Sequence, residues 1–265
     1  MNVTMLPSKD TRGDPAQWQA RIDLAAAHRL AVKDRLNEGI FNHFTLAVPN
    51  TNDRYYQIPF GLHWSEVSAS SFMEVSYNGE LLSGEGEIEH SGYCIHAPMH
   101  RLSKEASCVL HTHMPFASAL TRLKDQRILP VGQTELSVSI QTAYDDHYSG
   151  PASNPEEGER LLKVLGNKTI LLMANHGAVT IGRTVAEAYD RLYYLERVAQ
   201  VQLYAMWTGQ PLHVLSQEVV EKTIAEFRSP PTYYGRSNAE NHFEALKRLL
   251  DREQPDYKGQ TPHAL

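Results

Sequence analysis

The chain has 265 residues, 42% hydrophobic and 21% charged, a composition typical of a globular protein with one continuous core. Its 31 acidic and 25 basic residues are mixed along the chain, so no nucleic-acid-binding surface is expected. Only Cys94 and Cys108 are present, without a disulfide framework, and no segment resembles a signal peptide or membrane span. We therefore expect a cytoplasmic protein with one domain over residues 15–252 and terminal extensions at 1–14 and 253–265.

The first half of the chain alternates between helical patterns and short strand patterns. Apolar residues at helical spacing predict a long first helix, which Gly39 ends. Asn78-Gly79 indicates a hairpin turn. The predicted elements are a helix at 15–38, strands at 44–48 and 55–59, one or two helical turns at 69–75, a helix at 93–103 and a strand at 106–111.

The second half continues the alternation and ends in helices. The predicted elements are a helix at 115–123, turns and short strands at 130–144, a loop at 145–153, a helix to 165, a strand at 169–174, a long helix at 184–207, and helices at 217–227 and 238–251. Short strands alternating with helices predict an α/β fold, in which helices cover a mixed sheet.

Three histidines follow the two most apolar strands. His111 and His113 lie two positions apart, so strand alternation directs both imidazoles to one face. His176 occupies the matching place after the strand at 169–174. Catalytic zinc sites commonly use three protein ligands and leave one position open. These histidines are therefore predicted to bind one divalent ion. Packed or solvated histidines are the alternative, because 13 histidines make chance pairs common.

Three motifs carry further information: CVLHTH at residues 108–113, ANHG at 174–177, and YLER at 194–197 within the long helix. In order and spacing they resemble the class II aldolase and adducin family. The resemblance implies a single α/β/α domain with a central, mostly antiparallel sheet, assembled as a homotetramer. It also implies that His111, His113 and His176 hold zinc, or else iron, manganese or cobalt, which polarises a substrate carbonyl.

The acid/base group departs from the family pattern. The sugar-phosphate aldolases place a glutamate nineteen residues before the first metal histidine, where this chain has Gly92. Glu89 is the predicted substitute, with a solvated surface carboxylate as the alternative. His96, which shares a helix face with His100, is a second candidate base, with internal packing as the alternative. Four tyrosines, at 144, 148, 233 and 234, are possible proton donors, and the sequence selects none of them.

The phosphate-binding segments of those aldolases are also altered. Asn42-His43 replaces their glycine-asparagine pair, and IPFG at 58–61 replaces threonine-proline-serine-glycine. Apolar side chains there remove hydrogen-bond donors for a dianion, which disfavours a phosphorylated sugar. The residues expected to contact the substrate are His43, Phe60, Gly61, Ser91 and Gly92.

These features favour a metal-dependent lyase, either an aldol-type or a decarboxylating enzyme, acting on a small unphosphorylated carbonyl or carboxylate compound. An iron oxygenase is an alternative, because three imidazoles also suit ferrous iron. A non-catalytic adducin-like binding domain is the other alternative, because Gly92 is a loss of the kind seen in that branch.

Overall fold

The structure, a computed structural model, describes residues 14–148 and 150–259. Its strands are β1 (His43–Ala47), β2 (Arg54–Gln57), β3 (Met73–Ser76), β4 (Leu81–Ser83), β5 (Cys108–Thr112), β6 (Thr142–Asp145), β7 (Ile170–Met173) and β8 (Ala178–Gly182). They form one eight-stranded sheet in the order β4-β3-β2-β1-β5-β8-β7-β6. Only the β6–β7 pair is parallel, so the predicted mostly antiparallel sheet is confirmed.

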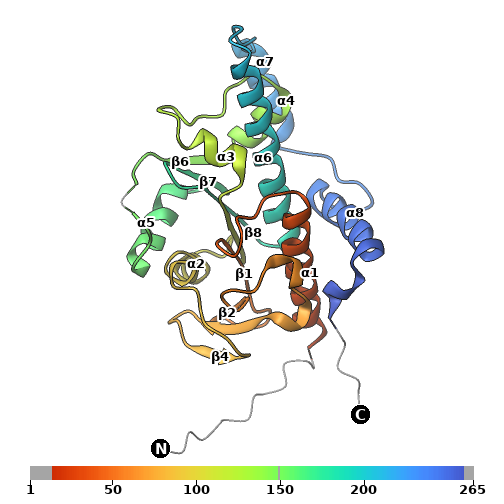
Figure 1. The fold of residues 1–265 in the computed structure, drawn as a ribbon. Helices are drawn as coiled ribbons and strands as arrows, with labels where there is room; N and C mark the ends of the chain where they lie inside the picture. Colours follow the sequence, from red (N-terminus) through yellow and green to blue (C-terminus); the bar gives the residue numbers. More distant parts are fainter. Residues whose placement is uncertain (1–13, 149, 260–265) are drawn as a thin grey trace, which may run out of the picture.

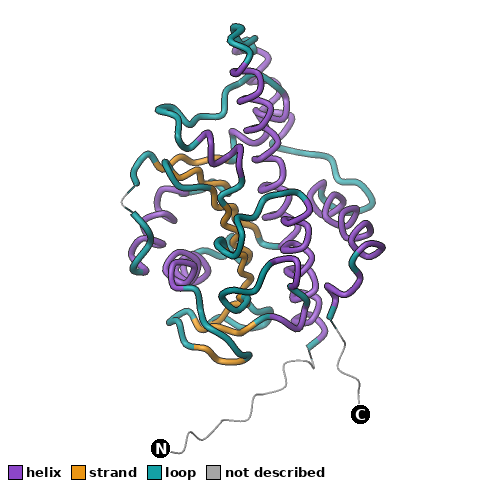
Figure 2. Tube along the Cα trace, in the orientation of Figure 1, coloured by secondary structure: helices purple, strands orange, loops and turns teal. Residues whose placement is uncertain are grey.

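Helices cover both faces of this sheet (Figures 1 and 2). The helices are α1 (Pro15–Lys33), α2 (His90–Leu102), α3 (Pro115–Leu120), α4 (Gln133–Ser139), α5 (Pro155–Leu165), α6 (Val185–Trp207), α7 (Gln217–Phe227) and α8 (Asn238–Glu253), with short 3-10 turns η2 (Trp64–Glu66), η3 (Ala69–Ser71) and η4 (Pro255–Lys258). In Figure 1, α2 and α5 lie on one face, and α1 and α6 on the other with α8 outside them. The fold is the predicted α/β arrangement.

The two faces carry separate apolar clusters, and alternation along β5 assigns its side chains to them. Cys108 and Leu110 belong to the cluster under α1 and α6. Val109 belongs to the cluster with Leu161 of α5. Because successive strand residues point to opposite faces, His111 lies on the face covered by α2 and α5.

The first helix ends five residues earlier than predicted. Lys33 is its last residue, and Arg35 then adopts a left-handed backbone conformation with φ of 60°. Leu36 N–H still reaches back to the Ala31 carbonyl at 2.8 Å, which closes the helix end. The apolar pattern continued past the true end because Leu36 is a core residue. The freed segment carries Glu38 toward the middle of the sheet.

Two other predictions need correction, and one strand was not predicted. Residues 69–75 are a single 3-10 turn followed by β3, because the buried Met73 and Val75 pair with β2. Residues 130–144 contain the helix α4 as well as the start of β6. Strand β8 was not predicted, because it follows the ANHG motif so closely that no separate apolar run is visible. The Asn78-Gly79 hairpin is present between β3 and β4, with Gly79 at φ of 85°.

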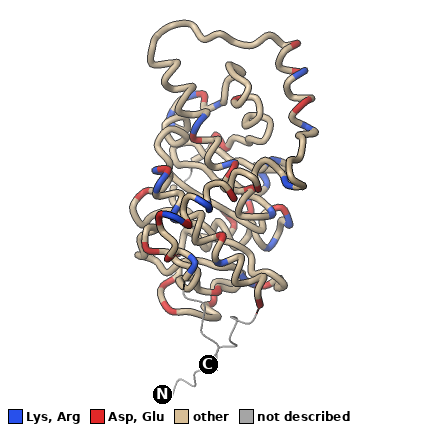
Figure 3. The backbone as a smooth tube through the Cα atoms, turned by 90° about the vertical axis from the view of Figure 1, so that its right-hand side faces the viewer, with Lys and Arg blue, Asp and Glu red and all other residues tan. Residues whose placement is uncertain are grey.

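The C-terminal part of the described chain packs against α1. Arg29 forms an ion pair with Asp256 at 2.8 Å, and Tyr257 is buried. The packed region therefore extends past residue 252, where the domain was expected to end, to η4. The predicted N-terminal extension lies, except for Asp14, outside the described residues. Within the described ranges, no helix combines the length and apolarity needed to cross a membrane. Acidic and basic residues are interspersed along the backbone drawn in Figure 3.

Buried His28 makes the fold sensitive to acid. Its ring packs against Phe44, Trp64 and Phe72, and burial lowers its pKa from 6.5 to about 4. The unfolded chain therefore takes up this proton first, and the stability is lost as pH falls from 6.5 to 4. We expect His28→Gln to weaken the pH dependence of the unfolding free energy by about 3 kcal/mol between pH 7 and 4. Urea unfolding of chelator-treated protein measures it. Parallel curves for the two proteins would contradict the assignment.

Candidate metal centre

The central strands bring the three predicted histidines together. His111 is on β5 and His113 follows it, while His176 lies in the turn between β7 and β8. Since β5 pairs with β8, this turn ends beside the two other histidines. The three ring centroids are each 4.9 Å from the other two. One nitrogen from each ring lies within 4.8 Å of the others. The described part of the chain thus offers a group of three imidazole ligands.

Hydrogen bonds on the outer side of two rings leave the inner nitrogens free. His111 Nδ1–H donates to the Ala178 carbonyl at 3.0 Å, and His113 Nδ1–H donates to Glu38 Oε2 at 2.5 Å. The two Nε2 atoms then carry lone pairs and face each other at 3.1 Å. Such outer partners orient metal-binding histidines in proteins. Two converging lone pairs repel each other unless a cation lies between them, so the residues fit a divalent ion.

Burial favours the neutral form of His111 and His176, which is the state that binds a metal. It lowers the pKa of His111 well below its usual range, and neighbouring His176 adds to the effect. It also lowers the pKa of His176 to about 4, with a contribution from His113. Neighbouring His43 has a pKa lowered to about 4 by burial, although the Glu89 carboxylate opposes the shift. Neutral ligands can accept an ion near neutral pH without first releasing protons.

The histidines open into a cavity of about 280 Å³. Its walls come from the segment before β1, the N-terminal end of α2 and the loop after β6; the lining residues are Glu38, Phe41, Asn42, His43, Glu89, Ser91, Ile95, His111, His113, Tyr148, Pro151, Ala152 and His176. This volume suits a small molecule. The lining contains carboxylates and imidazoles but no lysine or arginine.

The other predicted site residues are distributed around this cavity. Glu89, His43 and Ser91 line it. His96 is fully buried behind His43, and its two ring nitrogens contact His43 and Thr45.

Gly92 lies directly behind the cavity wall, with the side chains of His43 and Glu89 against its backbone. Phe60 is 44% exposed and contacts the lining residue Phe41 at 6.4 Å between ring centroids. Gly61 follows it and does not line the cavity. Phe60 and Gly61 therefore lie near the cavity without forming its wall.

Sequence reasoning missed Glu38 and Asn42 and did not distinguish Tyr148 from the other tyrosines. Asn42 adopts φ of 105°, and its Oδ1 accepts hydrogen bonds from the backbone N–H groups of Glu38 and His113. Tyr148 lies 6.2 Å from His176 between ring centroids. Their roles depend on contacts between segments far apart in the chain. The one local signal was the residue type of Asn42, because asparagine tolerates a positive φ better than most other residues.

The YLER motif supports the chain segment that follows His113. Glu196, on α6, is buried, and its two carboxylate oxygens accept hydrogen bonds from Phe116 N–H at 2.9 Å and Ala117 N–H at 2.8 Å. These N–H groups belong to the first turn of α3, which has no side-chain cap from its own Met114. Burial raises the pKa of Glu196, while the two N–H groups oppose the shift.

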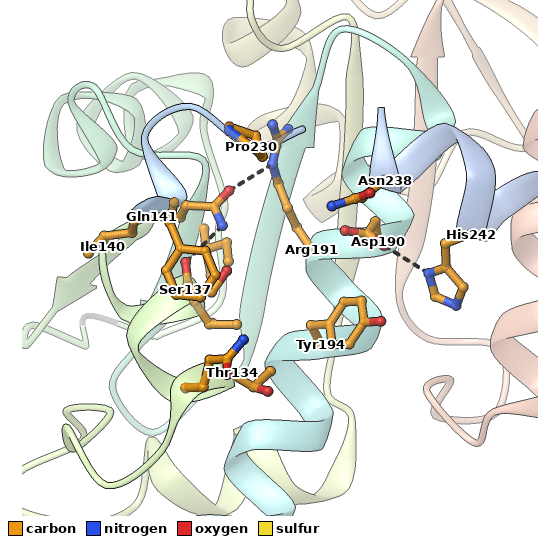
Figure 4. A pocket seen from close by; sticks show the side chains of 14 residues that line it. Thr134, Ser137, Ile140, Gln141, Asp190, Arg191, Tyr194, Pro230, Asn238 and His242 are labelled. Atoms are coloured by element: carbon orange, nitrogen blue, oxygen red, sulfur yellow. Dashed lines mark hydrogen bonds and ion pairs between the residues drawn. The ribbon is translucent and has the colours of Figure 1, made fainter. Parts of the chain in front are cut away.

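A larger cavity of about 530 Å³ lies between α4, α6 and the α7–α8 region (Figure 4). Its charged side chains form hydrogen bonds or ion pairs with other groups of the protein. His242 pairs with Asp190 at 2.8 Å, and Arg191 donates to Gln141 and to the Ile181 carbonyl. The three-histidine group lies elsewhere. We therefore place the candidate site at the histidine cavity.

Residues 22–203 match the family model described as the Class II Aldolase and Adducin N-terminal domain. The chain belongs to the class II aldolase and adducin family. One relative, a Pseudomonas aeruginosa protein whose name places it provisionally among class 2 aldolases, is 36% identical over 92% of this chain and 93% of its own length. Alpha-adducin of Rattus norvegicus is 31% identical over 92% of this chain but only 35% of its own.

The solved structures support the same membership. The crystal structure of an aldolase II superfamily protein from Pseudomonas syringae matches with a TM-score of 0.85 and 32% identity, covering 93% of this chain and 98% of that one. The resemblance to the class II aldolase and adducin family noted in the motifs is thus confirmed.

Proposed function

We propose that the protein is a metal-dependent lyase that cleaves a carbon–carbon bond in a small unphosphorylated carbonyl or carboxylate compound. The observation that carries the proposal is the group of three imidazoles whose nitrogens converge at the wall of the cavity. Membership of a family that includes aldolases supports the reaction class. A divalent ion, zinc in the first instance, would act there as a Lewis acid that polarises a carbonyl.

The cavity lining supports an unphosphorylated substrate. Phosphate groups in proteins are usually bound by arginine, lysine or converging backbone N–H groups. No lysine or arginine lines this cavity, and Glu38 and Glu89 place carboxylates at its wall. A phosphate dianion would meet like charge there. A neutral hydroxyl or keto group is compatible with the same surroundings.

Glu89 and Tyr148 are the proposed proton-transfer groups. The Glu89 carboxylate is oriented by Ser91 and by Gly92 N–H, which donate to it at the start of α2. It remains at the cavity wall, where it can accept a proton from a substrate hydroxyl. The Tyr148 hydroxyl belongs to a side chain that is 48% exposed and is available to return one. For His96, which has no contact with the cavity, we propose a positioning role.

A homotetramer in the cytoplasm is the proposed assembly. Support comes from the outer end of α6, where Val201, Tyr204 and Trp207 are 55%, 46% and 72% exposed and follow one another at helical spacing. Apolar side chains grouped on one helix face commonly contact a partner, and we assign this face to a second copy of the chain. The buried free thiols Cys94 and Cys108 agree with a reducing compartment. Light scattering gives the number of subunits.

Metal removal and reloading tests the function. We expect the purified protein to cleave unphosphorylated 4-hydroxy-2-keto acids, to lose this activity on chelation, and to regain it anaerobically with zinc, manganese or cobalt. Matched sugar phosphates should be poor substrates. Activity that requires ferrous iron and consumes oxygen would instead indicate an oxygenase. Absence of stoichiometric metal, together with no cleavage, would favour an adducin-like binding domain, which the similarity to alpha-adducin also suits.

A further inference from the structure

A buried chain of hydrogen bonds connects the segment before β5 with the cavity. Its end far from the cavity is His100, whose Nδ1 contacts the backbone carbonyl of Ala106 at 2.7 Å. A carbonyl only accepts, so the proton must be on Nδ1 of His100. Burial lowers the pKa of His100 to about 4, so the ring is neutral and its Nε2 carries a lone pair.

The next three links are then determined in turn. Nε2 of His100 accepts from the Thr45 hydroxyl at 2.8 Å. The single Thr45 proton is now used, so the hydroxyl oxygen accepts from Nδ1–H of His96 at 2.6 Å. His96 is also neutral, because burial lowers its pKa well below the usual range. Its Nε2 therefore accepts from Nδ1–H of His43 at 3.0 Å.

The chain ends at two hydrogen-bond acceptors that face each other. The contact with His96 fixes the proton of the neutral tautomer of His43 on Nδ1, so that tautomer presents a lone pair on Nε2, which lies 3.4 Å from Glu89 Oε2. Both atoms belong to residues that line the cavity. Neither acceptor can donate to the other, and Glu89 Oε2 already accepts from Gly92 N–H and Ser91 Oγ, so a proton donor in the cavity would bond chiefly to His43 Nε2. The His43 ring also stacks on the metal-binding His111, 4.9 Å between centroids.

Gly92 makes room for this pair. A Cβ atom at position 92 would lie 3.0 Å from Glu89 Oε2 and 3.0 Å from the His43 ring. Those distances are shorter than ordinary van der Waals contact, so a larger side chain would push one of the two acceptors away. Gly92 therefore permits the close approach of His43 and Glu89 at the cavity wall.

We propose that His43 Nε2 and Glu89 Oε2 together form a subsite that accepts a hydrogen bond from a substrate hydroxyl, and that Thr45, His96 and His100 are positioning residues that fix the proton of His43 on Nδ1. Because His43 stacks on His111, the substrate class is a hydroxy-carbonyl compound whose hydroxyl lies next to the metal-polarised group. The assignment of the bound hydroxyl to a substrate rests on the proposed function. The tautomer of His43 does not, because it follows from the hydrogen bonds alone.

Nuclear magnetic resonance of histidine side chains tests the positioning role. In zinc-loaded, full-length protein labelled with 15N-histidine, we expect protonated Nδ1 and bare Nε2 in His43, His96 and His100, assigned with single His→Gln variants. Thr45→Val removes the link without changing the volume, and His43 should then show a mixture of tautomers. Thr45→Ser keeps the hydroxyl and should match the wild type. A proton on Nε2 of wild-type His43, or equal spectra for the two Thr45 variants, would overturn the chain of inference.

Binding of two small keto acids tests the subsite itself. Titration calorimetry on the zinc-loaded protein should show hydroxypyruvate binding roughly tenfold more tightly than pyruvate, which lacks the hydroxyl. Gly92→Ala should lose this preference while it retains pyruvate affinity and metal content. Equal affinities in the wild type would overturn the subsite, whether or not the protein is a lyase. Conversely, a preserved preference without carbon–carbon cleavage would leave the subsite standing and contradict only the proposed reaction.

Discussion

His111→Ala is expected to abolish stoichiometric divalent metal binding. Its Nε2 is one of three converging nitrogens, and its other nitrogen is held by the Ala178 carbonyl, so the substitution removes one of the three candidate ligands. Two remaining imidazoles form an incomplete ligand set. We expect more than a hundredfold loss of affinity for zinc, since removing even an outer partner of a ligand costs about 10–100-fold. Elemental analysis after dialysis against a weak chelator measures the loss.

A matched control is His213→Ala, which removes an exposed histidine from the segment between α6 and α7. Its metal content should equal that of the wild type. If His111→Ala retained one equivalent of metal per subunit, the three-histidine site would be wrong, and both the lyase and the oxygenase interpretations would lose their basis.

Glu196→Ala is expected to lower the free energy of unfolding by about 3 kcal/mol. The substitution leaves the N–H groups of Phe116 and Ala117 without acceptors inside the protein, at the start of a helix that lacks a side-chain cap of its own. Buried unsatisfied donors of this kind cost about 1–3 kcal/mol each, partly offset by relief of the buried charge. Urea unfolding of chelator-treated protein gives the value.

The matched control for this substitution is Glu226→Ala, on the exposed surface of α7, which should change stability by less than about 0.5 kcal/mol. Glu196→Gln should fall between the two, because an amide oxygen can still accept one of the two hydrogen bonds. An unchanged unfolding free energy in Glu196→Ala would show that the start of α3 does not depend on the carboxylate.

The sequence predicted the parts of the site that depend on local periodicity. Strand alternation was enough to place His111 and His113 on one face, and the end of the second apolar strand supplied His176. The sheet class and most helices were equally accessible, because their apolar spacing is strong. Helix α4 was missed because its sequence, QTELSVS, has few good helix formers and follows Gly132, which supplies no side-chain cap.

The parts that could not be predicted depend on pairing between distant segments. Glu38 reaches His113 only because α1 ends early at a left-handed Arg35. The contact between His43 and His96 depends on α2 crossing the sheet over β1, a packing that no local pattern encodes. Glu89 was named as a substitute base outside the helix predicted at 93–103, but its place as the N-cap of α2 and on the cavity wall required the three-dimensional arrangement.

The division between strands and connecting segments has an evolutionary consequence. The candidate metal-binding histidines belong to β5, the residue after it and the turn entering β8, in the middle of the sheet. The remaining cavity wall comes from residues 38–43, the start of α2 and the loop at 148–152. Substitutions or insertions in these segments can change which molecule fits without moving the ligands. The same three-histidine group can therefore be combined with different cavity walls, and so with different substrates.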